Sequence, residues 1–265
     1  MKRLAALLAA VPVLAACGAS VDESAQDLTY PATAAVVARA ATIPAPALRA
    51  ADGSASFLVS GHELLRFDPA TREQTRSYDL GGAWKLEGVS ANGRWVGLTR
   101  AGTEIVVLDA ETGTVADELE LSGSFVVETI SVDGDFLFLQ QNFVDGTYAV
   151  RGYDLTRNQM LPGSLGTKGE TVKMQGRAGQ VVASPDGEWL LTLYVNTKSN
   201  TAFVHALNLF DKVPVCILLP PCEECDESDL GRWTLKLRAD GRTLVATHPA
   251  LGRALIDLPT GEVVV

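Results

Sequence analysis

Copies of a turn-forming dipeptide stand at five regularly spaced positions along this chain, and this spacing restricts the possible folds more than any other feature. The dipeptide is Asp-Gly or Asn-Gly, and the copies stand at Asp52-Gly53, Asn92-Gly93, Asp133-Gly134, Asp186-Gly187 and Asp240-Gly241. Successive copies are 40 to 54 residues apart. Each copy predicts a β-hairpin, because a type I′ turn needs a positive φ at both central residues and these residue types tolerate it. A repeat of this length indicates an array of similar units.

A second signature follows each turn after 16 to 22 residues. It consists of an Asp or Asn that comes directly after an apolar residue and before another turn. The five copies stand at Asp68, Asp109, Asp154, Asn208 and Asp257. Apolar, β-rich segments lie between the two signatures, for example 104–108 and 189–195. One unit therefore predicts four short strands, with an Asp-Gly turn after the first strand and a Thr-Gly type of turn after the third.

This unit resembles the blades of YVTN-type and WD-repeat-like β-propellers of bacterial secreted proteins. The resemblance implies an all-β fold, a β-propeller of about five four-stranded blades over residues 44–265. The blades are expected at approximately 44–82, 83–124, 125–172, 173–230 and 231–265. The chain lacks the Gly-His and Trp-Asp pair of true WD repeats, and the third unit lacks its Thr-Gly turn. The alternative is a β-sandwich with incidental turns. Five blades would make a small closed ring. Alternatively, the segment 32–43 would supply a strand that closes the ring against the last blade.

The N-terminus has the pattern of an export signal. Met1-Lys2-Arg3 is basic, and Leu4 to Ala16 is apolar but too short to remain as a membrane-spanning helix. This segment ends in Leu14-Ala15-Ala16-Cys17-Gly18, which resembles the bacterial lipobox. The resemblance implies that 1–16 is a signal peptide, that Cys17 is acylated and becomes the N-terminus, and that 17–43 is a flexible tether. It implies a lipoprotein anchored in the bacterial cell envelope and facing the periplasm or exterior. An ordinary secretory signal is the alternative.

Composition and motifs exclude several functions. The chain has 22 basic and 32 acidic residues and a formal charge of −10, so we expect no nucleic-acid partner. The sequence carries no serine-hydrolase, zinc-protease, P-loop or dinucleotide-binding motif. We therefore predict no catalytic residue, no cofactor and no metal ligand.

The irregular loops predict where a partner or ligand binds. In a blade of this topology, the loops between second and third strands and the loops between blades lie on one face, opposite the short turns. Irregular loops on a rigid scaffold commonly carry binding sites. The candidate binding residues on this face are His62, Asp145, Asn196, Asn200, His248, Glu223, Glu224 and Asp226.

Three cysteines lie near the end of the fourth unit. They are Cys216, which lies on the expected outer strand, and Cys222 and Cys225, which lie in an acidic loop. In an exported protein, one disulfide is the simplest interpretation, and we expect Cys216 to pair with Cys222 or Cys225. The alternatives are a redox-active Cys-x-x-Cys pair, or a zinc site completed by His62 or His248, since the first and fifth blades are neighbours in a closed ring.

Two classes of function are compatible with the sequence. The first is a lipid-anchored, non-catalytic binding or scaffold module for an unknown protein or ligand of the envelope. The second is a propeller-type envelope enzyme, such as a hydrolase or lactonase, for which Asp, Glu or His side chains would have to converge at the centre of the ring. A metal or redox carrier that uses the cysteine loop is a third hypothesis.

Overall fold

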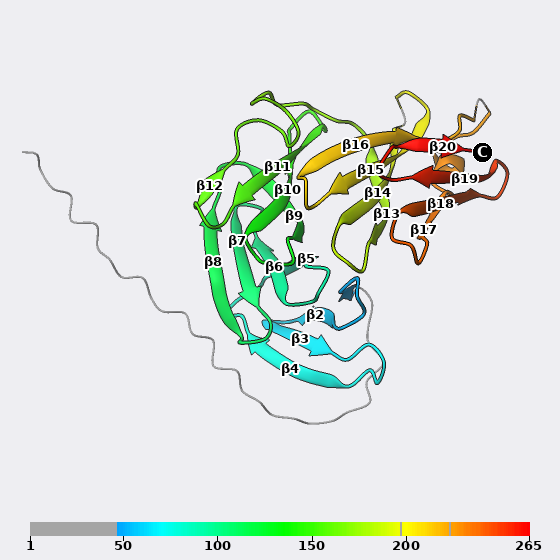
Figure 1. Ribbon diagram of the computed structural model, residues 1–265. Helices are drawn as coiled ribbons and strands as arrows, with labels where there is room; N and C mark the ends of the chain where they lie inside the picture. Colours follow the sequence, from blue (N-terminus) through cyan, green and yellow to red (C-terminus); the bar gives the residue numbers. More distant parts are fainter. Residues whose placement is uncertain (1–46, 197, 223) are drawn as a thin grey trace, which may run out of the picture.

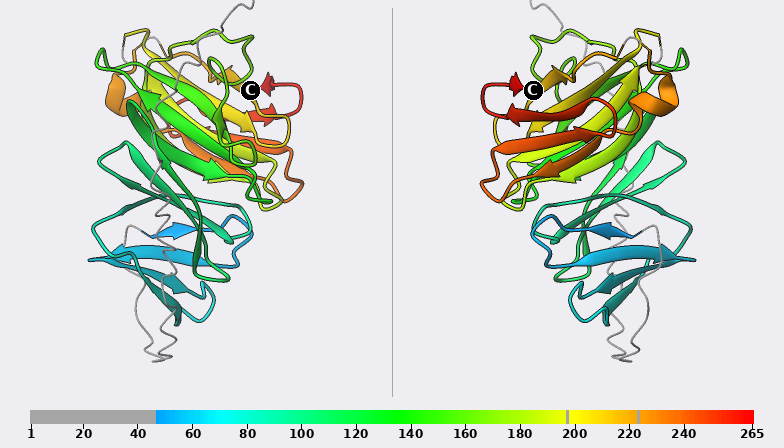
Figure 2. Two further views of the ribbon diagram at one scale, coloured as in Figure 1. Left: turned by 90° about the vertical axis from the view of Figure 1, so that its left-hand side faces the viewer. Right: turned by 90° about the vertical axis from the view of Figure 1, so that its right-hand side faces the viewer.

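The computed structural model describes residues 47–265 except 197 and 223, and it consists of five four-stranded antiparallel sheets. The sheets follow one another along an arc, each built from consecutive strands, as Figures 1 and 2 show. This is the all-β, five-bladed propeller architecture that the repeat predicts, and the β-sandwich alternative is wrong. The expected signal peptide, Cys17 and the expected tether lie outside the described residues.

Each blade pairs its strands in chain order from the inner to the outer edge. Blade 1 contains β1 (Leu48–Arg49), β2 (Ser56–Ser60), β3 (Glu63–Phe67) and β4 (Gln74–Asp79); blade 2 contains β5 (Lys85–Val89), β6 (Trp95–Arg100), β7 (Glu104–Asp109) and β8 (Thr114–Glu120). Blade 3 contains β9 (Ser124–Ile130), β10 (Phe136–Asn142), β11 (Tyr148–Asp154) and β12 (Gln159–Met160). Blade 4 contains β13 (Arg177–Ala183), β14 (Trp189–Asn196), β15 (Thr201–Asn208) and β16 (Val213–Leu218). The short helix α1 (Glu227–Leu230) precedes blade 5, which contains β17 (Thr234–Leu237), β18 (Thr243–His248), β19 (Gly252–Asp257) and β20 (Glu262–Val264).

The five Asp-Gly and Asn-Gly dipeptides all join the first and second strands of a blade, but their turn type differs from the prediction. In blade 4, the N–H of Gly187 donates to the carbonyl of Ser184 at 3.0 Å, and only the glycine of this turn has a positive φ, of 77°. This is a type I turn followed by a glycine bulge, so the type I′ prediction is wrong. The reason is the side chain of Asp186, whose Oδ1 accepts from the Ser184 hydroxyl and from the N–H of Glu188.

Hydrophobic clusters join the blades in pairs. One cluster spans blades 1 and 2, another blades 2 and 3, two span blades 3 and 4, and the largest spans blades 4 and 5. Residues from both sides of each junction include Phe57 and Val96, Val107 and Val127, Phe138 and Leu190, and Leu191 and Leu244. Among residues 47–265, apart from the two undescribed positions, no cluster joins blade 5 to blade 1.

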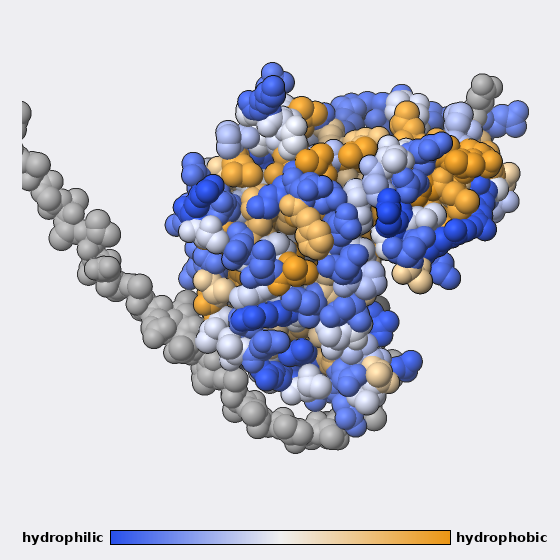
Figure 3. Space-filling model, in the orientation of Figure 1, coloured by the Kyte–Doolittle hydropathy of each residue, from blue (hydrophilic) through white to orange (hydrophobic). Residues whose placement is uncertain are grey.

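Within the described part of the chain, the arc is open between its first and last blades. Figures 1 and 2 show these two blades at opposite ends of the arc. Each blade completes its four strands from its own sequence, so the first and last blades exchange no strand within the described part of the chain. The proposed closing segment, 32–43, lies outside it. Figure 3 shows apolar surface at the C-terminal end of blade 5, where Val264 and Val265 are exposed.

The junction between blades 2 and 3 depends on two glycines. Gly88 of β5 and Gly97 of β6 are paired in register, and a Cβ added to either would lie 2.6 Å from Cγ1 of Val127. Val127 is buried and its β-branched side chain has little rotational freedom. The two glycines therefore form the recess that receives Val127 and sets how closely β9 approaches blade 2.

We predict that Gly97→Ala lowers the free energy of unfolding by about 1–3 kcal/mol, because the added methyl group overpacks this recess. Urea denaturation measures the loss. Gly179→Ala is the matched control, since a Cβ on this strand glycine has no neighbour closer than 3.6 Å. Adding Val127→Ala to Gly97→Ala should cause a smaller loss than the two single changes summed, and strict additivity would contradict the proposed contact.

Candidate functional site

A pocket of about 520 Å³ lies on the inner side of the arc, where the first strands of the blades face one another. Residues of β1, β5, β9 and β13 line it, together with side chains from β10 and β14. Its apolar lining includes Leu48, Val89, Val126, Val181, Leu190 and Leu209. Val181 is 55% exposed, so this part of the wall is accessible from outside. The volume is in the range of small-molecule binding sites. We call this feature the axial pocket.

Glu128 lines the axial pocket because of a bulge in its strand. In the ladder between β9 and β10, Val127 pairs with Leu139 and Thr129 pairs with Phe138, so Glu128 is the extra residue. Bulges redirect side chains and are frequent beside functional sites. Val127 packs into blade 2, while Glu128 lines the axial pocket.

The carboxylate of Glu128 is poorly compensated. Its Oε2 atom is buried and has no hydrogen-bond partner. Burial raises the pKa of Glu128 to about 7 from its usual 4.5, because desolvation disfavours the charged form. An unpaired buried polar atom in a native structure is uncommon and calls for an explanation.

The other acid in the axial pocket, Glu87, is fully engaged. Its Oε2 accepts from the N–H of Val127 at 2.9 Å, and its Oε1 pairs with Lys85 at 2.7 Å. Glu87 therefore joins β5 to β9, and its role in the fold accounts for both oxygens.

Aromatic and polar side chains form the wall between blades 3 and 4. The rings of Tyr148, Tyr194 and Phe203 stack in sequence, with centroids 5.0 and 5.4 Å apart, and the Tyr194 hydroxyl donates to Oε1 of Gln140 at 3.0 Å. His205 lies edge-on to Tyr194, and its Nε2 is buried without a partner. Burial lowers the pKa of His205 to about 4, so this imidazole is neutral at physiological pH.

The residues predicted for the binding face do not form one site. His62 and Glu224 are exposed in their loops, and Asn196 accepts from two backbone N–H groups of its own loop. Asp145 pairs with Lys173 at 2.8 Å, and hydrogen bonds from Lys173 and Thr147 hold its pKa below the usual range. Glu223 lies outside the described residues.

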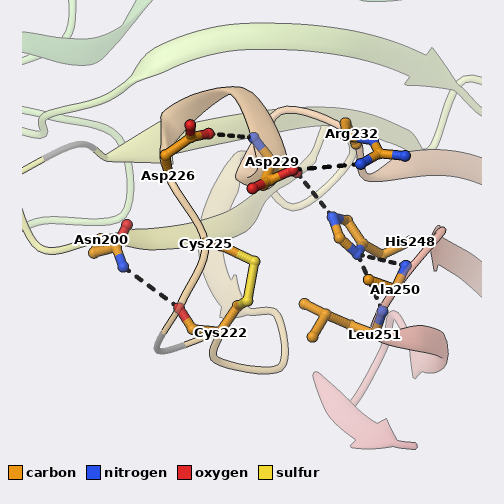
Figure 4. Close-up of a disulfide and its surroundings, with 9 residues drawn as sticks. All are labelled: Asn200, Cys222, Cys225, Asp226, Asp229, Arg232, His248, Ala250 and Leu251. Carbon is orange, nitrogen blue, oxygen red and sulfur yellow. Dashed lines mark hydrogen bonds and ion pairs between the residues drawn. A yellow bond between two sulfur atoms is a disulfide. The ribbon is translucent and has the colours of Figure 1, made fainter.

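The structure brings part of this set together beside blade 5, as Figure 4 shows. Asn200 donates to the carbonyl of Cys222 at 3.4 Å, and Asp226 caps the N-terminus of α1 by accepting from the N–H of Asp229. His248 is only 2% exposed, so the expectation that it lies on the loop surface is wrong. Its Nε2–H donates to the carbonyl of Asp229 at 2.8 Å, and its Nδ1 accepts from Leu251. These contacts hold the loop against blade 5.

The disulfide differs from the expected pairing. Cys222 is bonded to Cys225, and Cys216 is a free, exposed cysteine on β16. Cys216 is paired in the sheet with His205, whereas Cys222 and Cys225 share one tight loop with their Cα atoms 5.3 Å apart, a normal disulfide spacing. The preferred bond to Cys216 is therefore wrong. The zinc hypothesis does not fit this arrangement. The sulfurs of Cys222 and Cys225 are bonded to each other, and both ring nitrogens of His248 are hydrogen-bonded to backbone groups.

The axial pocket does not show the convergence that the enzyme hypothesis needs. Among the described residues that line it, the acids are Glu87 and Glu128 alone, and none is a histidine. In the part of the chain that the structure describes, no group of three or more His, Cys, Asp or Glu could hold a metal ion. Glu128 was not among the residues predicted from the sequence, although its position five residues before Asp133 matches that of Glu87 before Asn92.

Comparisons with known proteins agree with the fold. No family model matches the chain, and no curated protein matches it. Among solved structures, a protein from Agrobacterium tumefaciens described as TolB has 17% identity and a TM-score of 0.50, with 82% of this chain and 78% of that chain covered. BamB from Moraxella catarrhalis has 15% identity and a TM-score of 0.48, with 86% and 66% covered. Within the described residues, no helix has the length and hydrophobicity to cross a membrane.

We predict that Glu128→Gln stabilises the protein at pH 8 and has little effect at pH 4. The folded state holds the Glu128 proton up to about pH 7 and the unfolded state only to about 4.5, so stability falls as pH rises through this window. The predicted gain is on the order of 3 kcal/mol at pH 8. Urea denaturation at both pH values measures it.

Glu118→Gln is the control, since it makes the same chemical change on an exposed position of the outer strand β8. It should change stability by less than about 0.5 kcal/mol at either pH. If Glu128→Gln were equally neutral at pH 8, the carboxylate would not be destabilised by burial.

Proposed function

We propose that this protein is a lipid-anchored, extracytoplasmic β-propeller that binds a ligand or partner protein of the cell envelope without catalysing a reaction. The observation that carries the proposal is the axial pocket, which is open, apolar and walled by strands. A pocket with this lining and few polar groups suits recognition.

The chemistry of the axial pocket supports binding over catalysis. Hydrolytic catalysis needs a titratable group that transfers a proton and a second free group, such as a nucleophile or another acid, held in position beside it. Glu87 is engaged through both oxygens with β9 and with Lys85. Of the two acids among the described lining residues, Glu128 is then the one with an unsatisfied oxygen.

The N-terminal pattern supports the location. The lipobox-like sequence that ends at Cys17 is expected to attach the chain to a membrane after export, and two or three acyl chains give stable anchoring. Residues 17–43 would then separate the propeller from the membrane surface. The Cys222–Cys225 disulfide is compatible with an oxidising compartment outside the cytoplasm.

We predict that Cys17→Ser abolishes acylation of the protein. Cells grown with a labelled fatty acid should incorporate the label into the unmodified protein and not into the variant. Cys216→Ser is the matched control, because it removes the other cysteine that is outside the disulfide, and it should keep the label. Equal labelling of Cys17→Ser would contradict the anchor.

We predict that the axial pocket, and not the loop face, contacts the bound molecule in cells. A photo-reactive benzoylphenylalanine at position 181 would lie at the exposed wall of the pocket, and one at position 144 would lie at an exposed loop tip beside Asp145. Irradiation should give an adduct at position 181, detected by intact-protein mass spectrometry. Adducts at position 144 alone would assign binding to the loop face and overturn the proposal.

A further inference from the structure

Three inner strands of the propeller carry a bulge at an equivalent place. In the ladders between the first and second strands, the register shifts by one residue at three places. These lie between Leu86 and Gly88 on β5, between Val127 and Thr129 on β9, and between Ala178 and Val181 on β13. The polar residues at these bulges are Glu87 on β5, Glu128 on β9 and Gln180 on β13. Each stands five or six residues before the Asp or Asn of its turn.

Two of these three side chains bridge to the inner strand of the next blade. Glu87 accepts the backbone N–H of Val127 on β9 at 2.9 Å. Gln180 accepts the N–H of Leu235 on β17 at 2.8 Å and donates to the carbonyl of the same residue at 2.9 Å. The bulge therefore directs a long polar side chain across the junction, where a backbone N–H satisfies it.

Glu128 is the exception among the three. By the same pattern Glu128 would bridge to β13. The axial pocket lies between β9 and β13 instead, and Oε2 of Glu128 has no hydrogen-bond partner. The acceptor that elsewhere fastens two blades is here buried in a pocket of about 520 Å³. Oε2 is closed to solvent in this conformation, so a turn of the Glu128 side chain toward the pocket would bring it to the hydrogen-bond donor of a bound molecule.

We propose that Glu128 binds the ammonium group of a small amine whose apolar body fills the axial pocket, a proposal that rests on the binding function assigned to that pocket. A cation is favoured over a neutral donor because a buried carboxylate needs an opposite charge as well as a hydrogen bond. An apolar body is favoured because Val89, Val126 and Val181 form the surrounding wall. Positive charge on the ligand also matches the excess of acidic residues in the chain.

The other ionisable groups around the pocket leave this role to Glu128. Arg49 donates from Nε to the hydroxyl of Ser56, Glu87 is paired with Lys85, and the Tyr194 hydroxyl donates to Gln140. Behind Tyr194 lie Tyr148, which is neutral because burial raises its pKa, and the neutral His205. Since the pKa of Glu128 is about 7, amine binding should strengthen as pH rises through 7 and the carboxyl ionises.

The experiment is isothermal titration calorimetry of the full-length protein with 1-naphthylmethylamine, and with 1-naphthylmethanol as its neutral isostere. The amine should bind with a stoichiometry of one at pH 8, at least tenfold more tightly than the alcohol. Its affinity should fall about tenfold between pH 8 and pH 6, as the fraction of ionised Glu128 falls. Glu128→Gln should weaken amine binding at least tenfold and leave alcohol binding unchanged, while Glu118→Gln should change neither.

Equal affinity for amine and alcohol, an unchanged affinity in Glu128→Gln, or no saturable amine binding would each overturn the proposal. The cross-link at position 181 separates this failure from failure of the binding function. If the adduct forms while the amine does not bind, the pocket binds another class of molecule and only the amine proposal is wrong. If neither occurs, both proposals fail.

Discussion

Each blade of this propeller forms its sheet from its own consecutive strands within the described part of the chain, and this constraint governs how neighbouring blades are joined. No strand pairs across a junction, so side chains join one blade to the next, together with a few backbone hydrogen bonds such as those from Asp52 to Ala91 and from Phe125 to Gly102. Apolar clusters supply most of this contact, and the bulge residues Glu87 and Gln180 add hydrogen bonds at the inner edge. A junction is therefore only as close as its side chains allow.

The junctions differ in the side chains that form them. Blades 2 and 3 approach closely because Gly88 and Gly97 leave room for Val127, and Glu87 holds the two inner strands together. Blades 3 and 4 instead meet through large aromatic rings, with Tyr148 stacked on Tyr194. These rings lie beside the axial pocket, and Glu128 does not reach a backbone donor across it. The pocket and the unsatisfied carboxylate thus share one physical origin.

The fold was predictable from the sequence because its signal is local and repeated. Asp-Gly turns mark the ends of paired strands wherever they occur, and five in sequence specify five hairpins. The turn type was not predictable from the dipeptide, since it depends on Ser184 and Asp186 bonding to each other and to the backbone. Ring closure was not predictable either, because it depends on the summed geometry of all junctions and not on any one motif.

The residues of the candidate site could not be predicted from the sequence, for a related reason. A bulge shifts the strand register by one residue, so a sequence read with strict alternation gives no sign that Glu87, Glu128 and Gln180 project across the junctions. Their shared offset before each turn was the available signal. Blade 5 carries the apolar Leu235 at that offset. The disulfide was hidden because its formation depends on the position of β16, which places Cys216 opposite His205.

Glu128 and His205 impose opposite pH dependences on folding, and their balance bears on why the carboxylate is present. Protonation of His205 in the unfolded state removes stability as pH falls below about 6.5, while ionisation of Glu128 in the unfolded state removes stability as pH rises from about 4.5 to 7. A glutamine at position 128 would remove the second penalty, because it carries no charge to desolvate. Folds retain a destabilising group of this kind mainly at sites of function, where the group is needed for something other than folding. The unsatisfied acceptor, the apolar walls and the missing bridge to β13 are therefore best understood together, as one binding site on the inner side of the arc.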